Sequence, residues 1–197
     1  MSAVIARTLE EPLPESLPRP DAEEEWWICR ATGGDPEACA WLLRRYRARV
    51  VRLAAHVLRR PDEAEDAAQE AFVRAFRSLR DYRGHGRFYT WLYRIVVRAC
   101  IDRQRLARHQ REACLEDARV ADARQGVHER LLVAALLDQL SPPLRAALVL
   151  RELEGLEYEE IAAVLSVPVG TVRSRLNAAR KRFRTLYERA QEEEQSV

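Results

Sequence analysis

Glycine and lysine are scarce in this chain of 197 residues, which holds seven glycines and a single lysine, Lys181. Runs of β-branched residues are few, whereas Ala, Leu, Arg and Glu are abundant, and this composition favours helices over strands. No apolar run approaches the ~20 residues that a membrane-spanning helix needs. The N-terminus also lacks the basic-then-apolar order of a secretory signal peptide. We therefore expect an all-α protein that is soluble, cytoplasmic and not inserted in a membrane.

Cysteine and histidine are too few and too scattered to predict a metal centre. The four cysteines (Cys29, Cys39, Cys100 and Cys114) include no Cys-X-X-Cys pair and have no histidine at metal-ligand spacing. We expect them to be small buried residues in a reducing compartment. The chain also has no phosphate-binding glycine-rich loop and no nucleophile-elbow motif. These absences predict a protein that is not an enzyme and has no catalytic residue, metal or cofactor.

The residues that are present divide the chain into two helical blocks. Prolines and acidic residues dominate residues 1–22, which we interpret as a flexible tail. Helical periodicity covers residues 23–110 and 128–189, whereas the charged residues 111–127 have no large apolar residues in any period. An acidic tail, 190–197, follows. The sequence thus predicts two small helical domains joined by a flexible linker, and we expect each domain to fold independently.

The second block has the pattern of a helix-turn-helix. A short helix is predicted over 158–165, a turn over 166–169, and a longer helix from Gly170 to about Arg189. On that longer helix one stripe is apolar (Val172, Leu176, Ala179, Phe183 and Leu186), and the opposite face is basic or hydrogen-bonding (Ser174, Asn177, Ala178, Lys181 and Arg184, with Arg173 at its edge). Such a face suits the DNA major groove, although a basic face can also be a merely solvated surface.

The residues around this helix-turn-helix carry a family resemblance. The runs Leu-Arg-Glu-Leu-Glu-Gly-Leu (150–156), Tyr-Glu-Glu-Ile-Ala (158–162) and Val-Pro-Val-Gly-Thr-Val-Arg-Ser-Arg-Leu (167–176) resemble region 4 of the extracytoplasmic-function sigma factors, the short members of the sigma-70 family. The resemblance implies that the second helix reads the minus-35 promoter element through Thr171, Arg173, Ser174, Asn177, Lys181 and Arg184. The family usually has glycine at Ser166 and arginine at Ala178. We expect Ser166 to be tolerated if its φ angle stays negative.

The helix that follows Arg60 resembles sigma region 2.2. We expect Pro61 to begin it and its buried stripe to be Ala68, Phe72, Ala75, Phe76 and Leu79. Acidic residues near a helix N-terminus often only stabilise the helix, and Glu70 can pair with Arg74 at i,i+4. The run Asp-Glu-Ala-Glu-Asp-Ala-Ala-Gln-Glu-Ala-Phe (62–72) is nevertheless similar to the family's docking helix. The resemblance implies that Asp66, Gln69 and Glu70 contact the clamp coiled coil of the largest polymerase subunit.

The segment 83–95 resembles sigma regions 2.3 and 2.4. It contains two glycines, Gly84 and Gly86, that predict a mobile loop, and then a helix from Phe88 to about Arg108 with Phe88, Leu92, Ile95, Ala99 and Leu106 buried. Arginines can follow a phosphate backbone and aromatic side chains can hold an unstacked base. The resemblance implies minus-10 recognition and melting by Arg87, Phe88, Thr90, Trp91, Arg94 and Arg98. From the residues alone, Trp91 fits a core position as well as a stacking platform, and the family commonly has asparagine at Arg98.

Two other functions compete with promoter recognition by a sigma factor. The second block alone would suit a regulator that binds an operator unaided, but such a protein has no need of the melting-loop pattern. An adaptor that binds polymerase without DNA would not need the basic face of the last helix. The resemblance therefore predicts a monomer that binds core RNA polymerase and promoter DNA, with an anti-sigma factor as a further partner.

Overall fold

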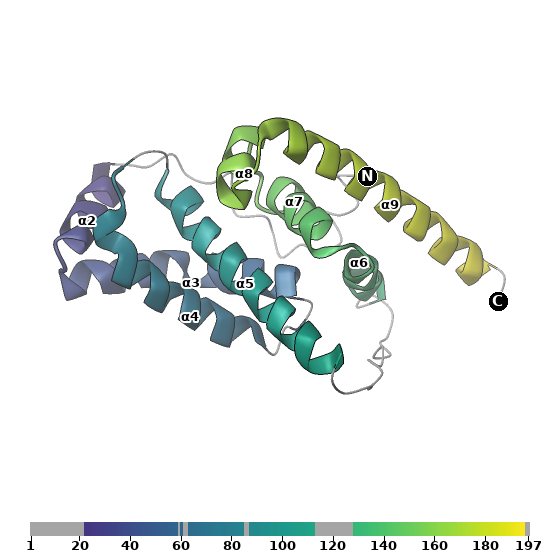
Figure 1. Ribbon diagram of the computed structural model, residues 1–197, viewed down its shortest axis with the longest axis horizontal. Coiled ribbons are helices and arrows are strands. Elements are labelled where there is room, and N and C mark those ends of the chain that lie inside the picture. Colours follow the sequence, from purple (N-terminus) through teal and green to yellow (C-terminus); the bar gives the residue numbers. More distant parts are fainter. Residues whose placement is uncertain (1–21, 59, 61–62, 85–86, 113–127, 196–197) are drawn as a thin grey trace.

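The computed structural model describes residues 22–58, 60, 63–84, 87–112 and 128–195, which form helices and turns with no strand among them (Figure 1). The first block contains α2 (Ala22–Thr32), α3 (Pro36–Leu58), α4 (Ala64–Ser78), the 3-10 turn η2 (Leu79–Asp81) and α5 (Phe88–Glu112). The second block contains α6 (His128–Asp138), α7 (Pro142–Glu152), α8 (Tyr158–Leu165) and α9 (Val169–Gln195). The all-α class expected from composition is confirmed.

Helix α3 is the centre of the first block, and α2, α4 and α5 pack around it. Its buried residues recur every three or four positions, so they share one face of the helix: Ala38, Leu42, Tyr46, Val50, Leu53, Ala54, Val57 and Leu58. Asp35 fixes the start of α3, because its Oδ1 accepts hydrogen bonds from the backbone N–H of Glu37 at 2.9 Å and of Ala38 at 3.4 Å. The preceding Gly34 has φ +88°, a conformation that glycine adopts without strain.

The second block is built on the contact between α7 and α9. All five residues of the predicted apolar stripe of α9 are buried, from Val172 to Leu186. The guanidinium of Arg145, in α7, is fully buried and closes the end of α6. Its Nε donates to the carbonyl of Leu137 at 2.8 Å and its Nη2 to that of Leu140 at 3.2 Å. These bonds satisfy the carbonyl of Leu137, in the last turn of α6, and that of Leu140, which follows the helix.

The two blocks pack against each other. Helix α8 lies against the first part of α5 (Figure 1). Helix α7 also contacts α3. The hydroxyl of Tyr93 in α5 donates a hydrogen bond of 2.7 Å to Glu154 Oε2, in the turn after α7, and both side chains are buried. The sequence analysis did not predict this contact. The predicted linker, 111–127, lies outside the described residues after Glu112, and independent folding of each block stays a prediction.

Several expectations about individual residues need correction. Helix α4 begins at Ala64 rather than Pro61, after a turn in which the Glu63 N–H donates to the Arg60 carbonyl at 3.0 Å; Pro61 itself lies outside the described residues. Leu106 is 60% exposed rather than buried, because it lies beyond Gln104, whose side chain meets the end of α3 at the Val57 carbonyl.

Two further differences concern cysteine and the acidic tail. Cys29 is exposed, on the outer side of α2, whereas Cys100 is buried as expected and Cys39 is half-buried. Cys114 lies outside the described residues. Helix α9 continues past Arg189 to Gln195, so most of the segment interpreted as an acidic tail extends this helix.

Candidate nucleic-acid and docking surfaces

The exposed face of α9 carries the predicted minus-35 residues. Arg173, Ser174, Asn177, Lys181 and Arg184 are all exposed, and Thr171 is half-buried at the first turn of the helix. The Ser174 hydroxyl donates to the Thr171 carbonyl at 2.9 Å. Opposite this face the apolar stripe anchors α9 on α7 and α8. The structure therefore gathers all six residues along one side of a rigid helix.

The turn before α9 differs from the expectation for Ser166. Its φ and ψ are +53° and +47°, the left-handed region, and it is the only non-glycine residue with positive φ among those described. The condition under which serine was expected to be tolerated, a negative φ, is therefore not met. The C-terminus of α8 needs a left-handed residue there so that the chain can reverse into Pro168 and begin α9 at Val169. Serine occupies this position at a cost of roughly 1 kcal/mol relative to glycine.

The predicted docking residues lie together on α4. Asp66 and Gln69 are exposed and Glu70 is half-buried. Glu70 Oε1 lies 2.6 Å from Arg74 Nη2, which confirms the i,i+4 pair expected from the sequence. Arg103 in α5 also reaches Glu70 at 3.2 Å and Asp66 at 3.8 Å. The carboxylates are therefore held by cations on one side and open to a partner on the other.

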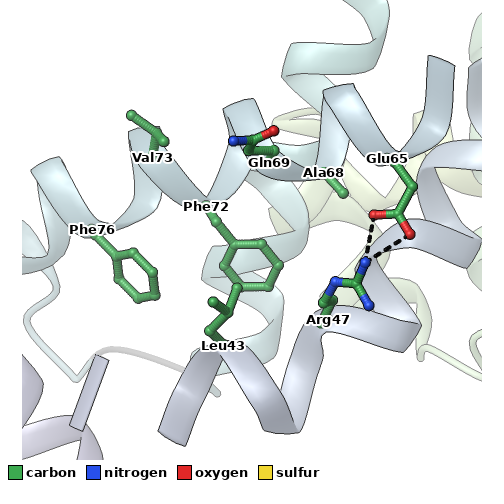
Figure 2. Close-up of a pocket in the computed structure, with 8 residues that line it drawn as sticks. All are labelled: Leu43, Arg47, Glu65, Ala68, Gln69, Phe72, Val73 and Phe76. Carbon is green, nitrogen blue, oxygen red and sulfur yellow. Dashed lines mark hydrogen bonds and ion pairs between the residues drawn. The ribbon is translucent and has the colours of Figure 1, made fainter. Parts of the chain in front are cut away.

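A hydrophobic groove between α3 and α4 adjoins these residues, and the sequence analysis missed it. Figure 2 shows its lining, which is Leu43, Arg47, Glu65, Ala68, Gln69, Phe72, Val73 and Phe76. Val73 is 42% exposed, a high value for a large apolar side chain on a packed helix. At one end, Arg47 Nη2 donates to both oxygens of Glu65, at 2.9 and 3.0 Å. The groove is thus apolar along its length and polar at its end, with Gln69 shared between groove and docking cluster.

Aromatic side chains form a cluster where α5 begins. The rings of Tyr82, Phe88 and Trp91 contact one another with centroids 5.4–5.5 Å apart, and Phe88 also contacts Tyr46 of α3 at 5.5 Å. Phe88 and Thr90 are buried, and Trp91 is half-buried. Phe88 is therefore the buried ring of the cluster, and Trp91 packs against it while remaining partly exposed to solvent. Gly84, which lies between Tyr82 and Phe88 in the sequence, has φ +71°; Gly86 lies outside the described residues.

The predicted minus-10 arginines are exposed, Arg87 just before α5 and Arg94 and Arg98 on it, but two of them contact α8. Arg94 Nε donates to the Ala163 carbonyl at 2.8 Å. Arg87 Nε lies 3.8 Å from Glu160 Oε1, and its Nη1 donates to the Tyr89 hydroxyl at 3.2 Å. The Tyr89 hydroxyl in turn donates to Glu160, and burial with this bond raises the pKa of Tyr89 to about 12. Arg98 is exposed one turn further along.

The part of the chain that the structure describes has neither a membrane-spanning helix nor a cluster of metal-binding side chains. None of its helices combines the length and apolar composition that crossing a membrane requires. The same residues contain no group of three or more His, Cys, Asp or Glu side chains arranged to hold a metal ion.

Comparison with known protein families matches both helical blocks. The family "Sigma-70 region 2" matches residues 42–112, and "Sigma-70, region 4" matches residues 130–183. Among curated proteins, the RNA polymerase sigma-H factor of Pseudomonas aeruginosa is 37% identical over 177 residues, which are 81% of this chain and 91% of that protein. The ECF RNA polymerase sigma-E factor of Escherichia coli is 36% identical over 77% of this chain and 87% of its own.

Solved structures give the same result for the fold. CnrH in complex with the cytosolic domain of CnrY aligns with a TM-score of 0.66 at 25% identity, covering 83% of this chain and 96% of that one. The sigma factor RpoE of Bartonella quintana, in complex with the anti-sigma factor NepR, aligns with a TM-score of 0.65 at 22% identity, covering 76% and 96%. The matched regions coincide with the two blocks that carry the predicted docking and DNA-binding residues, and the chain belongs to the extracytoplasmic-function sigma factors of the sigma-70 family.

Proposed function

We propose that this chain binds core RNA polymerase and directs it to promoters by reading a minus-35 element with α9 and opening a minus-10 element with the start of α5. Membership of the sigma factor family supports promoter-directed initiation. The observation that carries the finer assignment is the exposed row from Arg173 to Arg184 on α9, in a helix-turn-helix whose second helix is the expected reader.

The minus-35 element is read mainly from the first turns of α9. Arg173, Ser174 and Asn177 can hydrogen-bond to base edges in the major groove, and an arginine is the commonest reader of guanine. Lys181 and Arg184 lie further along the same face, where phosphate contacts would fix the register of the helix. Ala178 has no group that could bond to a base or phosphate, so the preferred minus-35 sequence differs from that of relatives with arginine there.

The minus-10 element is opened at the aromatic cluster. Trp91 is supported from beneath by Phe88 and Tyr82, so it can stack on an unstacked base while Arg87, Arg94 and Arg98 follow the phosphates. Thr90 and Phe88 are buried, and they act by shaping this platform. Trp91 can therefore be both a packed residue of the aromatic cluster and a surface on which a base stacks.

Core polymerase docks on α4 and the groove beside it. Asp66, Gln69 and Glu70 supply hydrogen-bond acceptors and an amide, and the apolar lining of Phe72, Val73 and Phe76 can receive a side chain of the partner. An interface with an apolar anchor and a polar rim is the usual arrangement in protein complexes. The anti-sigma factor NepR, bound to the similar sigma factor RpoE, supports an inhibitor of this kind for this chain.

The docking assignment can be tested by titrating fluorescent core polymerase with variants of the full chain. Asp66→Ala with Glu70→Ala, and separately Val73→Asp, should each weaken binding at least tenfold, since exposed substitutions leave the fold largely unchanged. Glu188→Ala removes an exposed carboxylate from the far part of α9 and is the control. Unchanged affinity in both docking variants would remove this face from the mechanism.

A further inference from the structure

A buried carboxylate connects the first turn of α2 to the aromatic cluster at the start of α5. Glu24 in that turn is 3% exposed, and its Oε1 accepts a hydrogen bond from the hydroxyl of Tyr46, in α3. Arg45 Nη2 lies 3.4 Å from the other oxygen of the carboxylate, Oε2. The ring of Tyr46 is buried and contacts the ring of Phe88 with centroids 5.5 Å apart. Glu24 is therefore linked, through one side chain, to the buried ring against which Trp91 packs.

The same turn of α2 lies beside the segment that leads into α5. Helix α2 packs against η2, and Tyr82 follows η2 directly. Burial, and then the charges of Glu24 and Glu25, raises the pKa of Tyr82, so both carboxylates act on its hydroxyl. The ring of Tyr82 contacts those of Phe88 and Trp91 at 5.5 and 5.4 Å. Glu24 thus adjoins a second ring of the cluster.

Net stability alone does not account for a carboxylate in this place. Burying a charge costs desolvation that its bonds offset only in part, and apolar residues of similar size often serve the fold as well. Hydrogen bonds to an ionised group are, however, short and directional, so they fix the orientation of both partners. Burial, and then the bond to Glu24, raises the pKa of Tyr46 well above its ordinary value, so the hydroxyl keeps its proton and donates. The bond therefore restrains the Tyr46 ring in a way that apolar packing would not.

We propose that Glu24 is a positioning residue for promoter opening. Through the hydroxyl of Tyr46 it holds the ring of Phe88, and with it Trp91, in the orientation that receives an unstacked base. The inference rests on the proposed function of the aromatic cluster at the minus-10 element. A binding surface works only when the side chains behind it hold it within ~0.5 Å of its productive geometry. Glu24 is buried, so it acts on the opening step through its neighbours and not by touching DNA.

Substitutions at Glu24 and Tyr46 can separate the hydrogen bond from the rest of the packing. Tyr46→Phe keeps the ring and removes the donor, and Glu24→Ala removes the acceptor. Glu24→Gln removes the charge but keeps a side chain whose amide can bond to a hydroxyl through either its oxygen or its nitrogen. Glu25→Ala removes an exposed carboxylate from the same turn and is the matched control, because it leaves the bond between Glu24 and Tyr46 intact.

The measurement uses holoenzyme assembled from core polymerase and each full-length variant, on a promoter fragment from which the wild-type holoenzyme initiates. A fluorescent base analogue in the minus-10 element reports the rate constant of opening, and competition with a duplex that carries only the minus-35 element reports binding by α9. Tyr46→Phe and Glu24→Ala should each slow opening about fivefold, the effect expected when the transition state lacks one hydrogen bond. Their affinity for the minus-35 duplex should stay at the wild-type value. Glu24→Gln should recover most of the rate, and Glu25→Ala should not change it.

A merely structural role would reduce the amount of active holoenzyme, which lowers the amplitude of opening but leaves its rate constant unchanged. An unchanged rate constant in Tyr46→Phe, or one in Glu24→Gln as low as in Glu24→Ala, would overturn the positioning role. Tyr46→Phe keeps the test decisive if Glu24→Ala folds poorly.

Trp91→Ala tests the proposed function separately on the same promoter fragment. Slow opening by Trp91→Ala together with normal opening by Tyr46→Phe would reject the positioning role alone. Normal opening by Trp91→Ala would reject both, because the aromatic cluster would then not open the promoter.

Discussion

The guanidinium of Arg180 in α9 donates two hydrogen bonds to one oxygen of Glu152 in α7, from Nη2 at 2.7 Å and from Nε at 3.0 Å. The Glu152 side chain is only 6% exposed, and its hydrogen bonds raise the pKa of Arg180. Charge-assisted bonds from a planar guanidinium restrict orientation as well as distance. This pair therefore helps to fix how α9 is rotated on α7, and so which of its residues form the exposed face that we propose binds DNA.

Glu152→Gln should destabilise the chain by about 1–3 kcal/mol, because Arg180 would keep a weaker neutral acceptor at a partly buried site. It should also weaken binding to every minus-35 sequence by a similar factor, since no DNA-facing residue is changed. Urea denaturation and competition binding of the holoenzyme measure the two effects. Glu159→Gln, at an exposed position of α8, is the control. A change confined to one minus-35 sequence would show that Glu152 acts on base reading rather than on helix placement.

Ser166→Gly should stabilise the second domain by about 1 kcal/mol, because glycine adopts the left-handed conformation without the steric cost that serine incurs. Ser166 is exposed, so little packing is lost. The change should appear as a higher midpoint in urea denaturation. Ser166→Ala retains a Cβ atom and should give no such gain; equal gains from both substitutions would argue against backbone strain as the cause.

The helix-turn-helix could be predicted from the sequence because its signals are local. The stripe from Val172 to Leu186 and the basic face opposite it lie on one helix, and the short helix at 158–165 has the bounds that the pattern indicated. The contact between Tyr93 and Glu154 joins residues 61 positions apart. The helical periodicity of a sequence carries no information about which distant residues meet. The only local signal was an acidic residue among the apolar residues of the turn after α7.

The docking surface was predictable only in part, because some of it depends on contacts between residues that are far apart in the sequence. Asp66, Gln69 and Glu70 were found through a family resemblance on one helix. The groove beside them depends on how α3 and α4 pack, and on Leu43, which the sequence analysis did not consider. The left-handed φ of Ser166 was not predicted, because serine itself gives no sign of it, although the glycine that the family usually has at this position was an indication.

Arg173→Ala should change which minus-35 sequences are accepted, with a loss of ~1–3 kcal/mol on the preferred one. Arg184 lies ~16 Å further along the same face and is better placed for phosphate. Arg184→Ala should therefore weaken all sequences alike and reduce the salt slope by about one unit. Competition binding of the holoenzyme to promoter variants at two salt concentrations separates these effects. If Arg173→Ala weakens binding to all sequences alike, as Arg184→Ala is expected to do, then Arg173 does not read the bases.

Ala178→Arg tests the position in the middle of the same helix at which this chain has alanine and the family usually has arginine. The added cation on the DNA-facing side should tighten binding to promoters and increase the salt slope by about one unit. The same holoenzyme competition measures it, with Ala178→Gln as the uncharged control of similar length. Equal behaviour of the two substitutions would show that position 178 does not meet DNA.

His56 should make the stability of the chain depend on pH. Burial, and then the nearby charge of Arg52, lowers the pKa of His56 from 6.5 to about 4. The unfolded chain thus binds a proton more readily than the folded chain, so this stability is present above pH 6.5 and is lost as the pH falls toward 4. Between pH 7.5 and 5 the loss should be about 2 kcal/mol. Urea denaturation of the wild type and of His56→Gln at both pH values gives the stability that each protein loses. The difference between the two losses is due to His56, because the other titrating groups contribute equally to both proteins. A wild type and a variant that lose equal stability would contradict this assignment.

Transcription in vitro from a library of bacterial promoter fragments, with purified core polymerase and this chain, tests the central claim most directly. The account predicts that adding the chain produces transcripts from a small set of fragments that share one minus-35 and one minus-10 sequence. Asp66→Ala with Glu70→Ala should reduce all of these transcripts, whereas Arg173→Ala should change the set. A chain that binds some of the same fragments without polymerase, but yields no transcript when core polymerase is supplied, would contradict the account and favour an operator-binding regulator.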